Sequence, residues 1–213
     1  MESKVGILLN NEINDIIDQL AKRMGTSKRN VISLALTRIL DSDLSKEKIY
    51  EIKTSIHDLN HATNITVNQQ FKKKLESIDR YGLSIRMFFG YLLCDYFYKH
   101  YSSFLGRDKL KEDVSEYETQ KENIQIKIDT NVKSKITSYC NDNSIAVSSL
   151  FAHYIMNKQI NINDFRSEET DFMTLTFSKG VKKRFHSNAK EMNVGYLYYI
   201  NLIAAQICEN LRL

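Results

Sequence analysis

Polar side chains that can form hydrogen bonds with a ligand alternate with apolar residues at several places along the chain. They are Lys4, Asn64, Thr66, Gln125, Lys127, Thr174 and Thr176. Their ammonium, amide and hydroxyl groups suit the recognition of a polar surface. The sequence contains no glycine-rich phosphate loop, no nucleophile-elbow serine and no metalloprotease helix. We therefore expect a binding protein that is not an enzyme and needs no cofactor and no metal.

These polar residues lie in four short stretches in which every second residue is apolar. The apolar positions are Val5, Ile7 and Leu9; Ile65 and Val67; Ile124, Ile126 and Ile128; and Met173, Leu175 and Phe177. A period of two predicts a strand with one buried face, so the polar residues between them should face outward. Such short strands require a partner strand and a cover of helices.

The same series of signals follows each predicted strand. The next residue is of a type that caps a helix N-terminus: Asn10, Asn68, Asp129 or Ser178. A short amphipathic helix, a turn and a strongly apolar second helix come next. The four copies span residues 5–40, 63–97, 124–156 and 173–208. A second helix that is apolar over so much of its surface predicts a core that it shares with other helices.

The composition agrees with a mainly helical protein. The chain has no proline, which would interrupt helices, and 42% of its residues are hydrophobic. A net charge of +4 permits nucleic-acid binding without arguing for it. No apolar run could span a membrane and the first residues do not form a signal peptide, so we expect a cytoplasmic protein. The three cysteines are far apart and are expected to be buried thiols.

The succession of strand, cap, short helix, Gly-x-Ser turn and apolar helix resembles the ribbon-helix-helix family. That family includes Arc, MetJ and the CopG-like plasmid copy-number repressors. The first copy is the most similar, through the run from Met24 to Lys28 and the apolar helix from Val31 to Leu36. The resemblance implies a mainly α fold with short β-ribbons, in which four ribbon-helix-helix units form two intramolecular pseudo-dimers.

The simplest organisation pairs copies that are neighbours in sequence. It gives one domain over residues 1–105, a charged linker over residues 106–122 and a second domain over residues 123–213. Pairing of the second copy with the third is an alternative. Between the first two copies, Ile49, Ile52, Ile56 and Leu59 predict an additional helix.

The resemblance also implies double-stranded DNA as the partner, with the ribbon in the major groove. The base-reading candidates would be the polar strand residues named above: Lys4, Asn64, Thr66, Gln125, Lys127, Thr174 and Thr176. The phosphate-binding candidates lie at the N-termini of the second helices: Ser27, Lys28, Ser84, Arg86, Ser148 and Gly195. Gly6 and Leu8 depart from the polar outward face of the family.

Three functions agree with these features. One is a sequence-specific regulator, either a transcriptional repressor or a plasmid or phage regulator. Another is an accessory DNA-binding factor of a relaxosome or a partition complex. The last, from a different class, is a protein-interaction scaffold that has lost DNA reading. A homodimer or a higher assembly on DNA is possible in each case that involves DNA.

Overall fold

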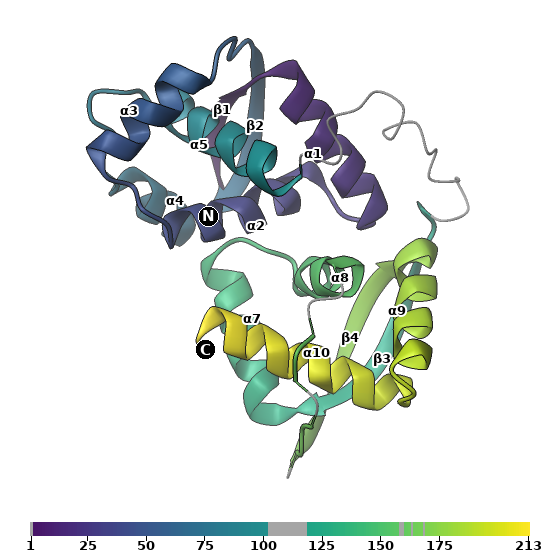
Figure 1. The fold of residues 1–213 in the computed structure, drawn as a ribbon. Helices are drawn as coiled ribbons and strands as arrows, with labels where there is room; N and C mark the ends of the chain where they lie inside the picture. The colour runs from purple at the N-terminus through teal and green to yellow at the C-terminus, as the bar shows by residue number, and fades with distance from the viewer. Residues whose placement is uncertain (1, 102–118, 158–159, 163, 168) are drawn as a thin grey trace. The chain divides into compact units, whose positions relative to one another are not determined.

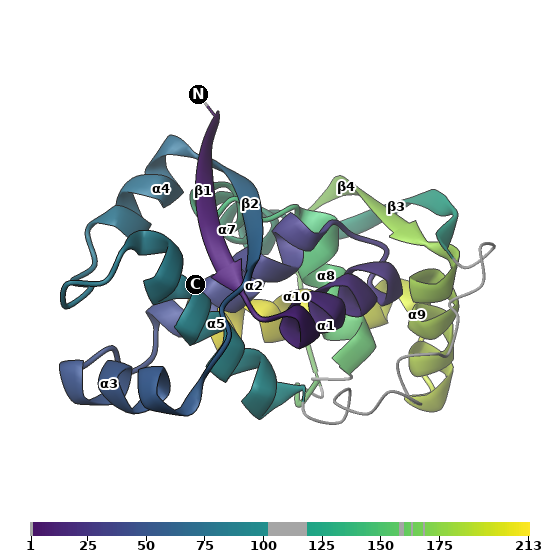
Figure 2. The same cartoon turned by 90° about the horizontal axis from the view of Figure 1, so that it is seen from above.

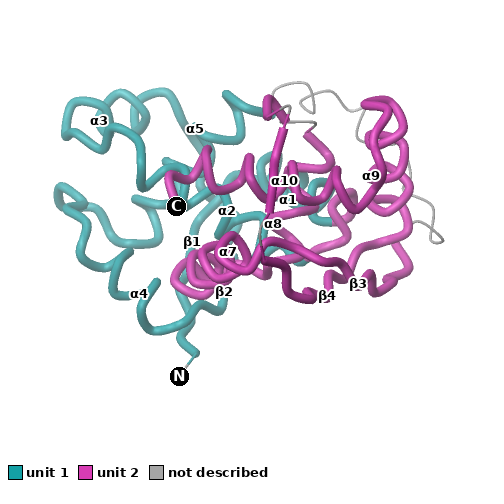
Figure 3. The backbone as a smooth tube through the Cα atoms, turned by 90° about the horizontal axis from the view of Figure 1, so that it is seen from below, with its two compact units in different colours: residues 1–21, 27–113 teal, residues 22–26, 114–213 magenta. Residues whose placement is uncertain are grey.

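The computed structural model describes residues 2–101, 119–157, 160–162, 164–167 and 169–213. The chain divides into two compact units (Figure 3). Unit 1 comprises residues 1–21 and 27–113, and unit 2 comprises residues 22–26 and 114–213. Each unit contains one two-stranded antiparallel sheet, which we call ribbon 1 and ribbon 2, together with helices (Figure 1).

Ribbon 1 joins the two repeated segments of unit 1. The elements follow in the order β1 (Glu2–Leu9), α1 (Asn11–Arg23), α2 (Lys28–Leu40), α3 (Lys46–Ser55), β2 (His61–Asn68), α4 (Gln69–Glu76) and α5 (Ile85–His100). Strands β1 and β2 run side by side (Figure 2), with Val5 opposite Ile65. Both of these side chains are buried, which places the apolar face of the ribbon in the core.

Ribbon 2 has the same place in unit 2. The elements follow in the order β3 (Lys121–Asp129), α7 (Thr130–Asp142), α8 (Val147–Asn157), β4 (Thr170–Ser178), α9 (Lys179–Glu191) and α10 (Tyr196–Leu211). Ile126 lies opposite Met173, and both are buried. The helices of the two halves interleave, because α7 packs against α10 and α8 packs against α9. Each strand of ribbon 2 is therefore covered by helices from both halves of the unit.

Side-chain caps start the first helix after every strand, as the sequence predicts. The backbone N–H three residues on donates to the cap in each case: Ile13 to Asn10 at 2.8 Å, Phe71 to Asn68 at 2.7 Å, Val132 to Asp129 at 2.9 Å and Val181 to Ser178 at 3.3 Å. Each bond satisfies an N–H that the helix itself leaves without a partner. These local predictions are confirmed.

The predicted fold class is wrong in its count of units. In the described residues the chain forms nine helices and two separate two-stranded sheets, not four ribbon-helix-helix units. Each repeated segment contributes a single strand, and β1 pairs with β2 while β3 pairs with β4. A ribbon requires two strands, so four segments supply only two ribbons, and the second and third strands do not pair with each other.

Two further boundaries differ from those that the sequence predicts. The additional helix α3 ends at Ser55, so Ile56 and Leu59 lie beyond it rather than on its apolar face. Ile56 is nevertheless buried, because the extended chain after the helix turns it toward the core. Of the predicted linker 106–122, residues 106–118 lie outside the described residues, and Lys121 and Glu122 form the start of β3.

Candidate nucleic-acid interface

Ribbon 2 presents a row of exposed polar side chains on the face opposite its core. Gln125 lies opposite Thr174, and Asn123 lies opposite Thr176. All four are exposed, whereas the residues between them on β4 are buried. The Thr176 hydroxyl donates to the Asn123 amide oxygen at 2.8 Å, which fixes one cross-strand pair in place. The structure thus brings the predicted residues of β3 and β4 together on one surface.

An aromatic side chain that the sequence pattern did not single out extends this row. Phe172 lies opposite Lys127 and is 54% exposed. The Lys127 ammonium group lies 5.3 Å from the centre of the Phe172 ring, within the range of a cation–π contact. The alternation that identifies Thr174 and Thr176 as outward residues includes Phe172 two positions earlier. That alternation was the signal in the sequence that could have identified Phe172 as an outward residue.

Ribbon 1 presents a different outward face. Lys4 lies opposite Thr66, Gly6 lies opposite Asn64, and Leu8 lies opposite Ala62. Lys4 and Asn64 are exposed and Thr66 is half-buried. The polar groups are therefore concentrated at one end of the ribbon, and Leu8 and Ala62 make the other end apolar.

The second helices of unit 2 pack against the outer edges of ribbon 2. At one edge, the Thr176 N–H donates to the Ser148 hydroxyl oxygen at 2.9 Å. At the other edge, the Asn201 amide donates to the Lys127 carbonyl at 3.0 Å. These bonds satisfy strand groups that have no partner strand. They place the first turn of α8 beside β4 and α10 beside β3.

This geometry changes the predictions for the phosphate sites of unit 2. Ser148 already accepts a hydrogen bond from the ribbon, so its oxygen has a structural role. Gly195 is the exposed N-cap of α10 and has no side chain that could cap the helix. The residues that follow it, Tyr196 and Leu197, carry no charge. A phosphate at this helix would depend on backbone N–H groups alone.

The corresponding positions of unit 1 carry cations. Ser27 caps α2 by accepting from the Asn30 N–H at 3.4 Å, and Ser84 caps α5 by accepting from the Met87 N–H at 3.3 Å. Lys28 pairs with Asp18 of α1 at 2.6 Å, so part of its charge is neutralised. Arg86 lies in the first turn of α5 and is exposed.

Two lysines of the helices near ribbon 2 are paired with carboxylates of its strands. Lys182 of α9 pairs with Glu122 of β3 at 2.6 Å, and this hydrogen bond lowers the pKa of the Glu122 carboxyl. Lys133 pairs with Asp171 at 2.5 Å, and the hydrogen bond from Lys133 likewise lowers the pKa of Asp171. Long-range attraction of an anion by these lysines is reduced accordingly.

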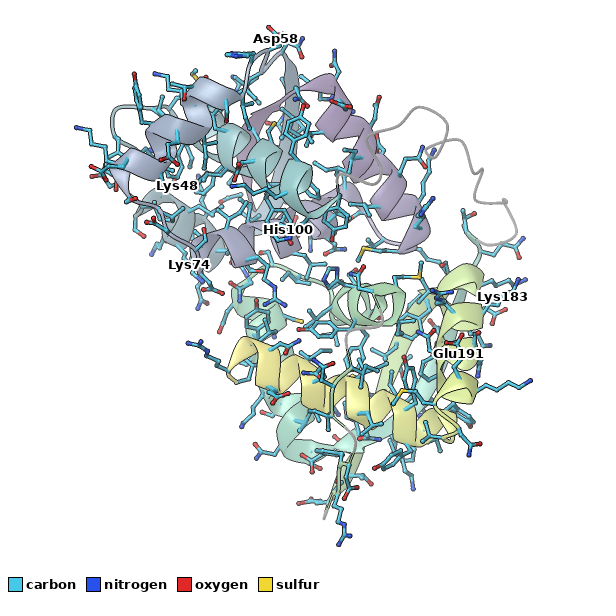
Figure 4. The ribbon with its side chains drawn as sticks, in the orientation of Figure 1. Lys48, Asp58, Lys74, His100, Lys183 and Glu191 are labelled. Carbon is cyan, nitrogen blue, oxygen red and sulfur yellow. The ribbon has the colours of Figure 1, made fainter. Side chains whose placement is uncertain are left out.

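The two basic runs lie on first helices, at residues 72–74 of α4 and 182–184 of α9. Figure 4 labels Lys74 and Lys183, both of which are exposed on these helices. Lys72 is partly screened by Glu76, whose carboxylate lies 3.7 Å from its ammonium group. These runs belong to the helical surface of each unit and not to the ribbon face.

Across the described ranges, no three histidine, cysteine, aspartate or glutamate residues form a group that could hold a metal ion. Nor does any helix among these residues have the length and hydropathy needed to cross a membrane. No protein-family model, no curated protein and no solved structure matches the chain. Function must therefore be inferred from the geometry of the ribbons.

Proposed function

We propose that the chain is a non-enzymatic, sequence-specific DNA-binding protein that inserts its two-stranded ribbons into the major groove. The observation that supports this is the exposed face of ribbon 2, where Gln125, Thr174 and Thr176 stand in cross-strand register over a buried apolar face. The resemblance of the repeated segments to the ribbon-helix-helix family supports the same proposal. The biological role would be that of a repressor or a plasmid or phage regulator.

The side chains on ribbon 2 match the chemistry of base edges. The major groove is wide enough for a two-stranded ribbon, and each base pair displays a distinct pattern of donors and acceptors there. Gln125 can form two hydrogen bonds with an adenine, Lys127 can donate to a guanine, and Thr174 can contact a thymine methyl group. These groups are exposed before binding, so reading a base would require no unfolding of the ribbon.

Fluorescence anisotropy with random duplex DNA and with DNA from the chain's own locus, across a salt series, tests the proposal. Binding through phosphates predicts an affinity that falls log-linearly with salt concentration. Binding through bases predicts a tighter complex with one particular sequence. The double variant Gln125→Ala/Thr174→Ala should lose roughly 5- to 150-fold in affinity for that sequence for each base contact removed. Its affinity for random DNA should change little.

A charge-matched pair of variants separates ribbon contact from general electrostatics. Lys127→Ala removes a cation from the ribbon face, and Lys53→Ala removes one from the exposed surface of α3. Only the first should weaken DNA binding appreciably. Weak binding to both DNAs without a salt dependence would contradict the proposal and favour the protein-interaction scaffold. Sequence-specific binding together with a neighbouring relaxase gene would favour the accessory factor of a relaxosome.

A further inference from the structure

The central outward position of β1 in ribbon 1 is a glycine, Gly6, and carries no side chain. Gly6, Asn64, Gln125 and Thr174 each lie four residues before the N-cap that follows their strand, so the four positions are equivalent. In ribbon 2 this central pair is Gln125 and Thr174, and in ribbon 1 it is Gly6 and Asn64. Gly6 therefore leaves a gap where ribbon 2 carries an amide.

The side chain of Arg86 fills this gap from outside the ribbon. A Cβ atom placed on Gly6 would lie 3.3 Å from the Arg86 Nε atom and 3.4 Å from its Cδ atom. It would also lie 3.3 Å from the Asn64 Oδ1 atom. The start of the guanidinium group thus lies over Gly6, on the outward face and beside the amide of Asn64.

The packing of α5 on β1 explains why Arg86 reaches this position. Gly90 allows such a close approach that a Cβ atom there would lie 2.0 Å from the Leu8 carbonyl oxygen. Arg86 precedes Gly90 by one helical turn, about 6 Å along the axis. Gly6 precedes Leu8 by two strand residues, about 6.7 Å. The two spacings match, so the helix that touches β1 at Leu8 also brings Arg86 to Gly6.

The guanidinium group is available to a ligand. Arg86 is exposed, and among the residues that the structure describes it has no hydrogen bond and no ion pair. Lys28, in the first turn of α2, is by contrast paired with Asp18. Arg86 is thus an unpaired cation on the ribbon face of unit 1 that comes from a helix rather than from a strand.

We infer that Arg86 is a specificity-determining residue of ribbon 1 and that its guanidinium group reads a guanine base. In this role Arg86 takes the place of the outward side chain that Gly6 lacks. A guanidinium group is planar and can donate two hydrogen bonds to the O6 and N7 atoms of guanine. Asn64 beside it would contact the adjacent base. Arg86 was predicted from the sequence as a phosphate contact, and the inference assigns it to a base instead. This inference rests on the proposed DNA-binding function.

The experiment compares Arg86→Lys with the unchanged protein in a selection from randomised duplex DNA, followed by anisotropy on the selected sequence. Lysine keeps the charge but cannot form the two parallel hydrogen bonds, so a phosphate contact would survive and base reading would not. We expect the preference for guanine at one position to fall by roughly 5- to 150-fold. Preferences at other positions and the affinity for random DNA should remain within about threefold.

Two further variants serve as controls. Arg184→Lys makes the same change on the exposed surface of α9 and should leave every base preference unchanged. Gly6→Ala displaces the guanidinium group by a few tenths of an ångström and should weaken the same single preference by a smaller factor. The Tm of Arg86→Lys should equal that of the unchanged protein, because the side chain is exposed.

Each other outcome has a definite meaning. If Arg86→Lys binds selected and random DNA with unchanged affinity and preference, or if both affinities fall equally, Arg86 does not read a base and the inference is wrong. If the unchanged protein binds DNA without any sequence preference, the inference is also wrong although DNA binding stands. If the unchanged protein binds no DNA, the proposed function itself fails.

Discussion

Helix α5 lies so close to strand β1 that Gly90 cannot be replaced without moving one of them. A Cβ atom on Gly90 would lie 2.0 Å from the Leu8 carbonyl oxygen and 3.1 Å from its carbonyl carbon. Ordinary contact begins at 3.4 Å, so Gly90→Ala requires a separation of about 1.4 Å. The obstacle is backbone oxygen, which cannot rotate away as a side chain would.

The expected magnitude follows from two opposing effects. Alanine in a helix interior is ordinarily more stable than glycine by about 1 kcal/mol. Overpacking of a close contact costs typically 1–3 kcal/mol, and a rigid obstacle favours the upper end of that range. Shifting α5 would also disturb Phe88 and Phe89, both of which are fully buried. We therefore expect Gly90→Ala to lower the free energy of unfolding of unit 1 by about 2 kcal/mol.

Cysteine protection during urea denaturation reports each unit separately. Cys94 lies in α5 of unit 1 and Cys140 lies in α7 of unit 2, and both thiols are buried. Gly90→Ala should lower the urea concentration at which Cys94 reacts with a thiol reagent by about 1 M, given a typical dependence on denaturant. The midpoint for Cys140 should move less.

Gly195→Ala is the matched control, because a Cβ atom there would meet nothing within 4 Å. It should change the midpoint for Cys94 negligibly. If Gly90→Ala leaves Cys94 as well protected as before, or protects it better, then the contact with Leu8 does not determine the packing of α5. The packing of α5 on β1 would then no longer explain the position of Arg86 either.

Three other perturbations follow from the caps and the buried thiols. Gly195→Ser should stabilise unit 2 by about 0.5 kcal/mol, measurable as a higher Tm, because α10 has no side-chain cap and the site has room for one. Burial raises the pKa of Cys94 to about 11 and that of Cys140 to about 12, so at pH 8 both should react with a thiol reagent far more slowly in the native chain than in urea. The hydrogen bond from the Val132 N–H lowers the pKa of Asp129 in the folded chain, so its stabilising effect is present above about pH 4 and disappears as the pH falls through the folded pKa. Asp129→Asn keeps a side-chain cap that does not titrate. Between about pH 5 and pH 2, the Tm of unit 2 should consequently fall less in this variant than in the unchanged chain. An equal fall in Tm would contradict this reasoning.

The sequence by itself determined those features that depend on residues near one another in the chain. The alternation at Val5, Ile7 and Leu9 defines which face of β1 is buried, because successive side chains of a strand point to opposite sides. Asn68 and Asp129 start helices because a cap bonds to a backbone N–H only three residues away. Such interactions require no knowledge of the rest of the fold.

Only the tertiary structure decided how these segments share their surfaces. The number of ribbons depends on which strands pair, and hydrogen bonds between distant segments leave no periodic signal in either one. The assignment of Arg86 to the ribbon face rests on its contacts with Gly6 and on the contact of Gly90 with Leu8. Gly6 and Leu8 are distant from Arg86 in the sequence, and Gly90 has no side chain that would contribute to a hydropathy pattern. The close approach of two backbones depends on how distant segments pack against each other. A glycine in the sequence does not reveal such an approach, because the same residue is compatible with a position where no other group occupies the space of its missing side chain.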